Sequence, residues 1–348
     1  MSDSDKDIMR VGVHWGELAG RRNQLRRIAE ATGVEPVIWR EGEPAPDVEA
    51  LIASTTPESV PGDTPHLRLL QLPSAGSEQL RDHPVWRSDV VIATASGVHG
   101  VQIPEHVLML LLALRRHLPQ YLNAQRRRLW WHDARADDGV SIAPGELYGL
   151  TLGLIGYGHI GRGVAHLARA FGMRVLATSH SVQEGRPLAI PSVAPFADPP
   201  AIPIPSLEPD RMTPMARLDD LLAASDAVVI CAPLTAETEG LLDAARLSRM
   251  KPGALLVNIA RGKIVVEDAL IQALSTGRLG GAGLDVTAEE PLPSDSPLWA
   301  MPNVIVTPHI SGISDRYVER AVNILLANID CLRRGEPPVT AVDRNRGY

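Results

Sequence analysis

The sequence predicts an α/β protein of two Rossmann-like or flavodoxin-like domains, each built on a parallel, doubly wound sheet, with a cleft between the domains. Three observations predict this class. Short apolar runs alternate with helix-length polar stretches, a glycine-rich loop directly follows one of these runs, and 348 residues suffice for about two domains.

The first hundred residues contain four short apolar runs that are typical of buried strands, at 9–13, 48–53, 67–72 and 90–93. A long helix is expected over 104–131, interrupted near Pro119. Pro104 suits a first helical position, and Glu105 suits the first turn, where the helix dipole favours an acidic side chain.

Six further strands are expected at 152–155, 175–177, 227–231, 254–259, 283–286 and 304–307, which describes a doubly wound sheet. The intervening stretch 181–216 contains nine prolines and is expected to be a loop or an insertion. A helix is expected over 314–334, and the tail 337–348 is expected to return to the first domain.

These elements predict the domain boundaries. Residues 1–117 and 318–348 are expected to form a flavodoxin-like, substrate-binding domain, and residues 118–317 a dinucleotide-binding Rossmann domain. The helices near Pro104 and Ser314 are expected to act as hinges.

Composition excludes several classes of protein. The longest apolar run, 107–114, is far shorter than the roughly 20 residues of a membrane span, and the acidic N-terminus does not resemble a secretory signal. Two separated cysteines, Cys231 and Cys331, predict neither a disulfide network nor a zinc site, and favour the cytoplasm. The net charge of -7 argues against a nucleic-acid partner.

Two groups of arginines are expected to be solvated helix faces. The first comprises Arg21, Arg22, Arg26 and Arg27, and the second covers residues 126–128. Neither group has the interleaved aromatic residues of a nucleic-acid surface.

A G-x-G-x-x-G motif lies between a predicted strand and a predicted helix, which is the context of a dinucleotide-binding loop. Gly156 would allow the tight turn, Gly158 would let the backbone approach a pyrophosphate, and Gly161 would permit close packing of helix on strand. The helix N-terminus would then face the anion.

The end of the second predicted strand indicates which cofactor is used. NAD enzymes carry a carboxylate there, whereas this strand runs into Ser179, His180 and Ser181, with Arg186 a few residues further on. Hydroxyl and imidazole groups can donate hydrogen bonds to a 2′-phosphate, so NADP is favoured over NAD.

Polar segments follow three later strands: NIARG at 258–262, LDV and EEP within 284–291, and TPHISG at 307–312. Together with GYGHIG at 156–161, their order and spacing resemble the D-isomer-specific 2-hydroxyacid dehydrogenase family. The resemblance covers most of the chain, including SAG at 74–76, ASGVHG at 95–100 and the terminal VDRNRGY.

The resemblance implies a role for each matching residue. Arg261 corresponds to the arginine that holds the substrate carboxylate, His309 to the general acid and base, and Glu290, rather than Glu289, to the carboxylate that orients the histidine. Asp285 looks like the residue that takes the nicotinamide carboxamide. A backbone cradle for the substrate carboxylate is implied at Ser74, Ala75 and Gly76. Arg261 and His309 are also expected to contact the substrate.

The residues expected to contact the cofactor lie in the loops that end the Rossmann strands. They are Gly156, Gly158, His159, Ile160, Gly161, Ser179, His180, Ser181, Ala232, Pro233, Ile259, Ala260, Asp285, His309 and Gly312. Among other candidates, His106 is expected to be a hydrogen-bonded core residue, and His99 could contact the substrate or the hinge near the cleft. Trp130 and Trp131 are expected to be packing residues, with a wall of the cleft supplied by a neighbouring subunit as the alternative.

The predicted function is that of an NAD(P)-dependent D-2-hydroxyacid dehydrogenase, or 2-oxo acid reductase, acting on a small acid such as glyoxylate or hydroxypyruvate. The resemblance further implies a homodimer formed through the Rossmann domains. Glu290 argues against the formate dehydrogenase branch, which replaces this glutamate. The alternative is a dinucleotide-sensing interaction protein, similar to the C-terminal binding proteins that act as corepressors, without significant turnover.

Overall fold

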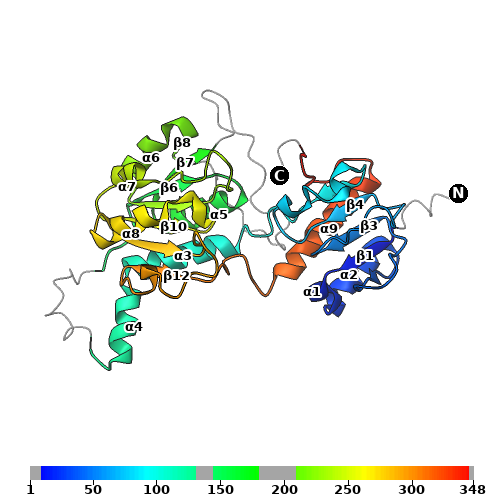
Figure 1. Ribbon diagram of the computed structural model, residues 1–348, viewed down its shortest axis with the longest axis horizontal. Helices are drawn as coiled ribbons and strands as arrows, with labels where there is room; N and C mark the ends of the chain where they lie inside the picture. The colour runs from blue at the N-terminus through cyan, green and yellow to red at the C-terminus, as the bar shows by residue number, and fades with distance from the viewer. Residues whose placement is uncertain (1–8, 131–143, 180–208, 345–348) are drawn as a thin grey trace. The chain divides into compact units, whose positions relative to one another are not determined.

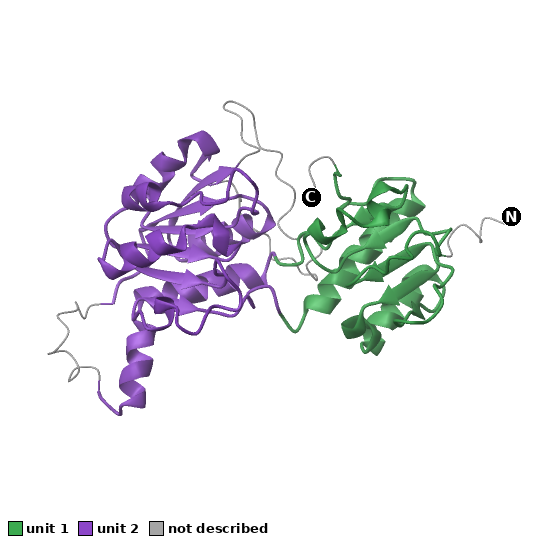
Figure 2. Cartoon of the chain, in the orientation of Figure 1, with its two compact units in different colours: residues 1–99, 194–200, 314–348 green, residues 100–193, 201–313 purple. Residues whose placement is uncertain are grey.

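The computed structural model describes residues 9–130, 144–179 and 209–344. The described chain divides into two compact units (Figure 2). Unit 1 contains residues 9–99 and 314–344, and unit 2 contains residues 100–130, 144–179 and 209–313.

Unit 1 is a parallel sheet of five strands in the order β2-β1-β3-β4-β5, with helices labelled in Figure 1. Its strands are β1 (Val11–His14), β2 (Val37–Ile38), β3 (Ala50–Ala53), β4 (Leu69–Gln71) and β5 (Val91–Ala93). Its α-helices are α1 (Gly16–Ala19), α2 (Arg22–Thr32) and α9 (Tyr317–Arg333).

Alternate residues of these strands face opposite sides of the sheet, as the period of a strand requires. Ala50 and Ile52 of β3 join a core that α9 covers, whereas Leu51 and Ala53 join a second core. Both faces are therefore buried, which is typical of a parallel sheet.

The end of the chain returns to unit 1, as the sequence predicts. Val342 N donates a hydrogen bond to Ile92 O at 2.8 Å, and the Arg344 guanidinium donates to the carbonyls of Ser88 and Val90. The tail thus extends the outer edge of the sheet at β5.

Unit 2 is a parallel sheet of seven strands in the order β12-β11-β10-β9-β6-β7-β8. Its strands are β6 (Thr151–Ile155), β7 (Arg174–Ser179), β8 (Arg211–Pro214), β9 (Ala227–Ile230), β10 (Ala254–Asn258), β11 (Leu279–Leu284) and β12 (Val304–Val306). Its helices are α3 (Gln102–Arg115), α4 (Leu118–Arg126), α5 (His159–Ala170), α6 (Leu218–Ala224), α7 (Ala244–Arg249) and α8 (Glu267–Ser275).

Strand order reverses between β6 and β9, so loops from both halves of the sheet diverge at this point. In open α/β sheets this crevice is where ligands bind, outside the carboxyl ends of the strands. The predicted α/β class, with two parallel doubly wound sheets, is confirmed.

Three strands differ from the sequence prediction. Strand β2 was not expected, β8 lies inside the stretch predicted as a loop, and β11 ends at Leu284 instead of spanning 283–286. The last two strands were missed or misplaced because they contain proline or glycine, which are typical of turns. Pro214 lies on the edge strand β8, where its missing N–H is tolerated, and the glycines of β11 permit close packing. An added Cβ on Gly283 would lie 3.0 Å from Leu110 Cβ of α3.

The long helix predicted at 104–131 is two helices, with the break at His117 in the left-handed region (φ 55°) and Pro119 in the first turn of α4. The chain passes between the units at His99–Gly100 and at Ile313–Ser314, whereas the sequence suggested 117 and 318. The reason is α3. It packs so closely on α5 that an added Cβ on Gly163 would lie 2.5 Å from Pro104 Cγ.

Within the described ranges, no helix is long and apolar enough to cross a membrane. Over the same ranges, no group of three or more histidine, cysteine, aspartate or glutamate side chains is placed to hold a metal ion.

Candidate active site

The glycine-rich loop joins β6 to α5 and presents backbone, not side chains, at the switch point. Gly156 has φ 97°, and an added Cβ there would lie 2.7 Å from Ala232 N at the end of β9. An added Cβ on Gly161 would lie 2.5 Å from Gly156 O, whereas Gly158 has no heavy atom within 4 Å of that position. Packing therefore requires glycine at 156 and at 161, whereas Gly158 borders open space.

The open space lies at the N-terminus of α5. Gly158 is the N-cap, no side chain caps the helix, and the first turn contains no acidic residue. Uncapped amides and the positive end of the helix dipole form an anion site, so the loop fits a dinucleotide pyrophosphate.

Arg162, in the second turn of α5, was not anticipated from the sequence. Its side chain is 4% exposed and lies 5.9 Å from the centre of the Tyr157 ring, in a cation–π contact. Burial lowers its pKa, and the negative charge that Tyr157 can carry opposes the shift. The signal in the sequence is an arginine within an otherwise small and apolar helix face.

The loop after β10 carries Arg261. Asn258, 1% exposed, closes the loop: its amide donates to Arg261 O at 2.9 Å, and its carbonyl oxygen accepts from Ala260 N at 3.1 Å. The Arg261 side chain is exposed, and its Nη1 donates to Ala260 O at 2.7 Å.

Gly262 brings this loop against the loop after β11. An added Cβ on Gly262 would lie 1.9 Å from Thr287 O, so only glycine permits the contact. The substrate-binding arginine expected from the sequence is thereby placed beside the loop that carries Glu290.

His309 and Glu290 form a polar pair at this edge of the sheet. His309 Nδ1 lies 2.7 Å from Glu290 Oε2, and Glu290 Oε1 accepts from Thr287 N at 3.1 Å. Because a carboxylate only accepts hydrogen bonds, Nδ1 carries a proton and Nε2 is left to exchange a proton with a substrate. The side chains remain 50% and 38% exposed, so both are accessible to a ligand.

Asp285 is buried beneath this pair, with 1% exposure. Its Oδ1 accepts from the Thr307 hydroxyl at 2.6 Å and from Ile310 N at 3.0 Å, and its Oδ2 accepts from Ser311 N at 3.0 Å. Burial alone would raise the pKa of Asp285, but the hydrogen bonds from Ser311, Thr307 and Ile310 together lower it. The carboxylate that the resemblance assigns to the nicotinamide thus also holds the 307–311 loop.

The 74–76 segment lies in unit 1, after β4. Ser74 Oγ donates to Gly76 O at 2.9 Å, Ala95 N donates to Ser74 O at 2.7 Å, and Tyr317 Oη donates to Pro73 O at 2.7 Å. His99 stacks on Tyr317, with ring centres 5.6 Å apart. Burial, followed by the charge of Glu17, raises the pKa of Tyr317 to about 12.

The structure groups most of the predicted site residues at the carboxyl edge of the unit 2 sheet. These are the glycine loop, Ala232 and Pro233 after β9, Ile259 to Arg261 after β10, Asp285 and Glu290 after β11, and His309 and Gly312 after β12. Ser179 ends β7. His180, Ser181, Arg186 and Trp131 lie outside the described residues.

Two lesser predictions have opposite outcomes. His106 is a half-buried, hydrogen-bonded residue of α3, as expected. Trp130 is 77% exposed, so the prediction that it packs within the chain is wrong. It lies beyond the last turn of α4, where no described part of the fold covers it.

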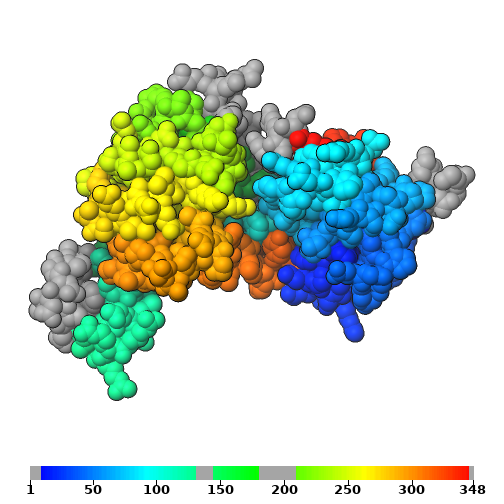
Figure 3. Space-filling view, in the orientation of Figure 1, coloured from blue at the N-terminus to red at the C-terminus, as the bar shows by residue number. Residues whose placement is uncertain are grey.

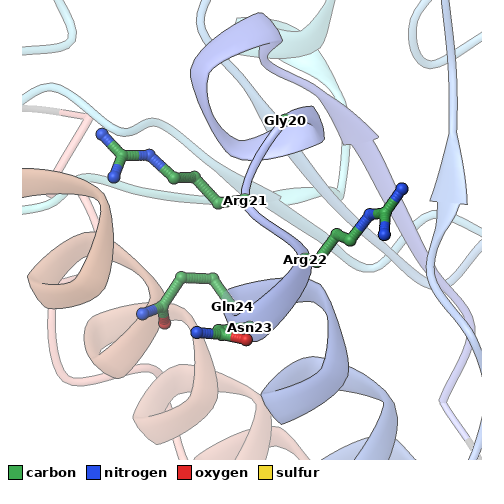
Figure 4. A pocket seen from close by; sticks show the side chains of 5 residues that line it. All are labelled: Gly20, Arg21, Arg22, Asn23 and Gln24. Atoms are coloured by element: carbon green, nitrogen blue, oxygen red, sulfur yellow. The ribbon is translucent and has the colours of Figure 1, made fainter.

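A pocket of about 380 Å³ in unit 1 is lined by Gly20, Arg21, Arg22, Asn23 and Gln24, between α1 and α2 (Figure 4). Arg26 pairs with Glu30 at 2.8 Å, and Arg27 donates to Gln24 and to Asn323 of α9. Arg21, Arg22 and Arg26 are exposed, in agreement with the predicted solvated helix face, whereas Arg27 is half-buried against α9.

A doubly wound sheet, an open glycine loop and a paired histidine at the carboxyl edge are features of dinucleotide-dependent oxidoreductases. Residues 108–311 match the model of the NAD binding domain of D-isomer specific 2-hydroxyacid dehydrogenases. The chain therefore belongs to the D-isomer specific 2-hydroxyacid dehydrogenase family, and it is an NAD(P)-dependent oxidoreductase that acts on CH–OH donors.

Individual relatives cover most of the chain. A glyoxylate reductase of Pyrococcus furiosus is 30% identical and is aligned over 92% of each chain. A glycerate dehydrogenase of Methylorubrum extorquens is 31% identical over 78% of each chain. A D-isomer specific 2-hydroxyacid dehydrogenase from Xanthobacter autotrophicus Py2, solved with NADPH and MES, superposes with a TM-score of 0.75, 28% identity, and coverage of 98% of this chain and 100% of that one.

Proposed function

We propose that this enzyme reduces a small 2-oxo acid, of the size of glyoxylate or hydroxypyruvate, to the D-2-hydroxy acid. The observation that carries the proposal is the 2.7 Å contact between His309 Nδ1 and Glu290 Oε2. A carboxylate on the far ring nitrogen fixes the orientation of the ring, and an imidazolium can donate a proton from Nε2 to a developing alkoxide.

The other roles follow from the charge that the reaction requires. Arg261 supplies a planar cation that can hold the substrate carboxylate and polarise the carbonyl, next to the loop that bears Glu290. We assign the carboxylate cradle to Ser74, Ala75 and Gly76 of unit 1, and dinucleotide binding to unit 2. The bound nicotinamide supplies the hydride, and the protein supplies orientation and the proton.

The substrate class rests on relatives. Proteins similar to this chain are called glyoxylate reductase and glycerate dehydrogenase, and these names refer to a small 2-oxo acid and a small 2-hydroxy acid. In oxidation, His309 would take the proton from the hydroxyl group, so the same residues serve both directions.

We propose NADP as the preferred cofactor. Strand β7 ends at Ser179, and the next residues in the sequence, His180 and Ser181, include no carboxylate to repel a 2′-phosphate. A related structure was solved with NADPH, which supports the same preference.

We further propose a homodimer formed through unit 2. Helix α4 stands out from the body of this unit (Figures 1 and 3). Leu118, Leu122, Leu129 and Trp130 are 44%, 43%, 37% and 77% exposed, and such a run of apolar side chains indicates an interface. The free thiols of Cys231 and Cys331 support a cytoplasmic location.

The test is oxidation of NADPH and of NADH with glyoxylate, hydroxypyruvate, pyruvate and bulkier 2-oxo acids. Turnover on the small acids that favours NADPH is the expected result, whereas a preference for NADH would overturn the proposed cofactor only. Tight cofactor binding without turnover on any acid would contradict the proposal and favour a dinucleotide-sensing interaction protein. Light scattering of the purified protein tests the dimer.

A further inference from the structure

Helix α3 contacts both ends of the loop that carries His309. Gln102 Nε2 donates to Gly312 O at 3.0 Å, and His106 Nε2 lies 3.0 Å from Thr307 Oγ1. Gln102 and His106 are four residues apart and therefore share one face of the helix. His309 lies between the two contact points and has a strained backbone, with φ 51°.

The hydrogen bond between His106 and Thr307 has a defined direction. The Thr307 hydroxyl has one proton, and it lies 2.6 Å from Asp285 Oδ1, which as a carboxylate can only accept. Thr307 must therefore donate to Asp285 and accept from His106. The consequence is that His106 carries its proton on Nε2.

The charged group that faces His106 is Asp285, with Oδ1 3.8 Å from His106 Nε2. Burial lowers the pKa of His106, and the charge of Asp285 opposes this shift without cancelling it. At neutral pH the ring is a neutral donor that completes the chain from His106 through Thr307 to Asp285.

We propose that His106 is a positioning residue for the reaction: its Nε2–H directs the Thr307 hydroxyl at Asp285 and so holds the loop that places His309. Asp285 binds Ile310 N and Ser311 N directly, which holds the carboxyl side of His309. On the amino side, His309 N donates to Asp285 O at 2.8 Å, and the Thr307 hydroxyl donates to Asp285 Oδ1. His106 determines the direction of the hydrogen bond between Thr307 and Asp285. This inference rests on the proposed function, because it assumes that His309 transfers the proton.

The test compares His106→Leu, which removes the donor, with His106→Gln, whose amide can donate from a similar position. We expect His106→Leu to lower kcat about 10- to 100-fold, since small displacements of a catalytic group have effects of this size, while NADPH affinity stays unchanged. His106→Gln should recover most of the activity. The matched control is His166→Leu on α5, which should leave kcat and loop exchange unchanged.

Thr307→Val removes the same hydrogen bond with little change in volume, and it tests the inference even if His106→Leu folds poorly. If both residues act through one bond, the double variant should lose no more activity than Thr307→Val alone. Thr307→Ser should retain activity. Multiplicative losses in the double variant would overturn the inference.

Hydrogen exchange of the 304–312 segment gives a readout that needs no turnover. The amides of His309, Ile310 and Ser311 should exchange faster in His106→Leu than in wild type, but not in His106→Gln. Unchanged exchange or wild-type kcat in His106→Leu would overturn the inference, as would equal impairment of the Leu and Gln variants. Absence of wild-type turnover would instead contradict the proposed function, and exchange would then decide the inference alone.

Discussion

The carboxyl edge of the unit 2 sheet and the 73–76 loop of unit 1 are held in different ways. In unit 2, charged groups organise the loops. The Asp285 carboxylate accepts hydrogen bonds from Thr307, Ile310 and Ser311, and the Glu290 carboxylate binds both His309 and Thr287 N. In unit 1, neutral groups do so, through Tyr317 and Ser74.

The difference follows from the chemistry that each region is proposed to perform. A group that transfers a proton must keep one tautomer and one orientation, and ionised partners impose both strongly. A cradle for a carboxylate needs only hydrogen-bond donors. Effects of substitution should therefore be larger in unit 2.

The largest effect is expected from His309→Gln. Loss of the proton donor should lower kcat about 100- to 10,000-fold, with NADPH affinity nearly unchanged because the glycine loop is intact. Steady-state kinetics and fluorescence titration of NADPH measure the two quantities. Near-normal kcat would remove His309 from the mechanism.

Arg261→Ala should come next. Loss of a charged hydrogen-bonding partner for the carboxylate should lower kcat/KM for glyoxylate about 100-fold, mainly through KM. Arg261→Lys keeps the charge but not the planar fork, so it should recover only part of this loss. Equal KM values for wild type and Arg261→Ala would contradict the assignment.

A matched pair of glycine substitutions separates folding from cofactor binding within unit 2. Gly158→Ala, in open space, should leave Tm unchanged and weaken NADPH binding about 10-fold, because the Cβ occupies the space proposed for the pyrophosphate. Gly156→Ala, with φ 97° and a backbone atom 2.7 Å away, should destabilise the fold by about 1–3 kcal/mol. The reverse pattern in calorimetry and binding would show that the loop is used differently.

Tyr317→Phe tests the neutral region in unit 1. One hydrogen bond to Pro73 O is lost, so KM for the 2-oxo acid should rise about 2- to 10-fold with kcat unchanged. A large fall in kcat would show that the two regions do not differ in the way proposed.

The smallest effects concern stability against pH, and they have opposite signs in the two units. Asp285 has a lowered pKa, so its carboxylate contributes fully to the free energy of unfolding above the ordinary value of 3.8, and this contribution is lost as the pH falls below that value. The Asp285→Asn variant should lack this loss of stability in acid. Tyr317 has a pKa raised from 10 to about 12, so folding loses stability as the pH rises through that interval. The Tyr317→Phe variant should lack this loss of stability at alkaline pH, as measured by urea unfolding curves.

Strong local patterns made much of the fold predictable. The glycine loop, most of the buried strands and α5 and α9 appear where periodicity and capping residues indicated. Strands β8 and β11 were missed or displaced because proline at a sheet edge and glycine at a crowded strand resemble turn signals. Whether such a residue lies in a turn or a strand depends on neighbours distant in sequence.

The resemblance to the family nominated Arg261, Glu290 and His309, and the need of one reaction for a cation, an orienting carboxylate and a proton donor agrees with that assignment. The pairing of His309 Nδ1 with Glu290 Oε2 required the loops after β11 and β12 to meet in the folded chain. Gly262 separately allows the loop that carries Arg261 to approach Thr287, in the loop that carries Glu290. The sequence alone also predicted that His106 is a hydrogen-bonded core residue, and it is hydrogen-bonded and half-buried.

Tertiary structure decided what His106 and Asp285 contact. Asp285 and Thr307 are 22 positions apart, and His106 and Thr307 are 201 apart, so no local pattern could indicate their hydrogen bonds. The sequence determines which functional groups are available at each strand end. The packing of α3 on the unit 2 sheet determines which of these groups form hydrogen bonds with one another. The physical reason is that hydrogen bonds depend on distances of about 3 Å, which only the folded chain defines.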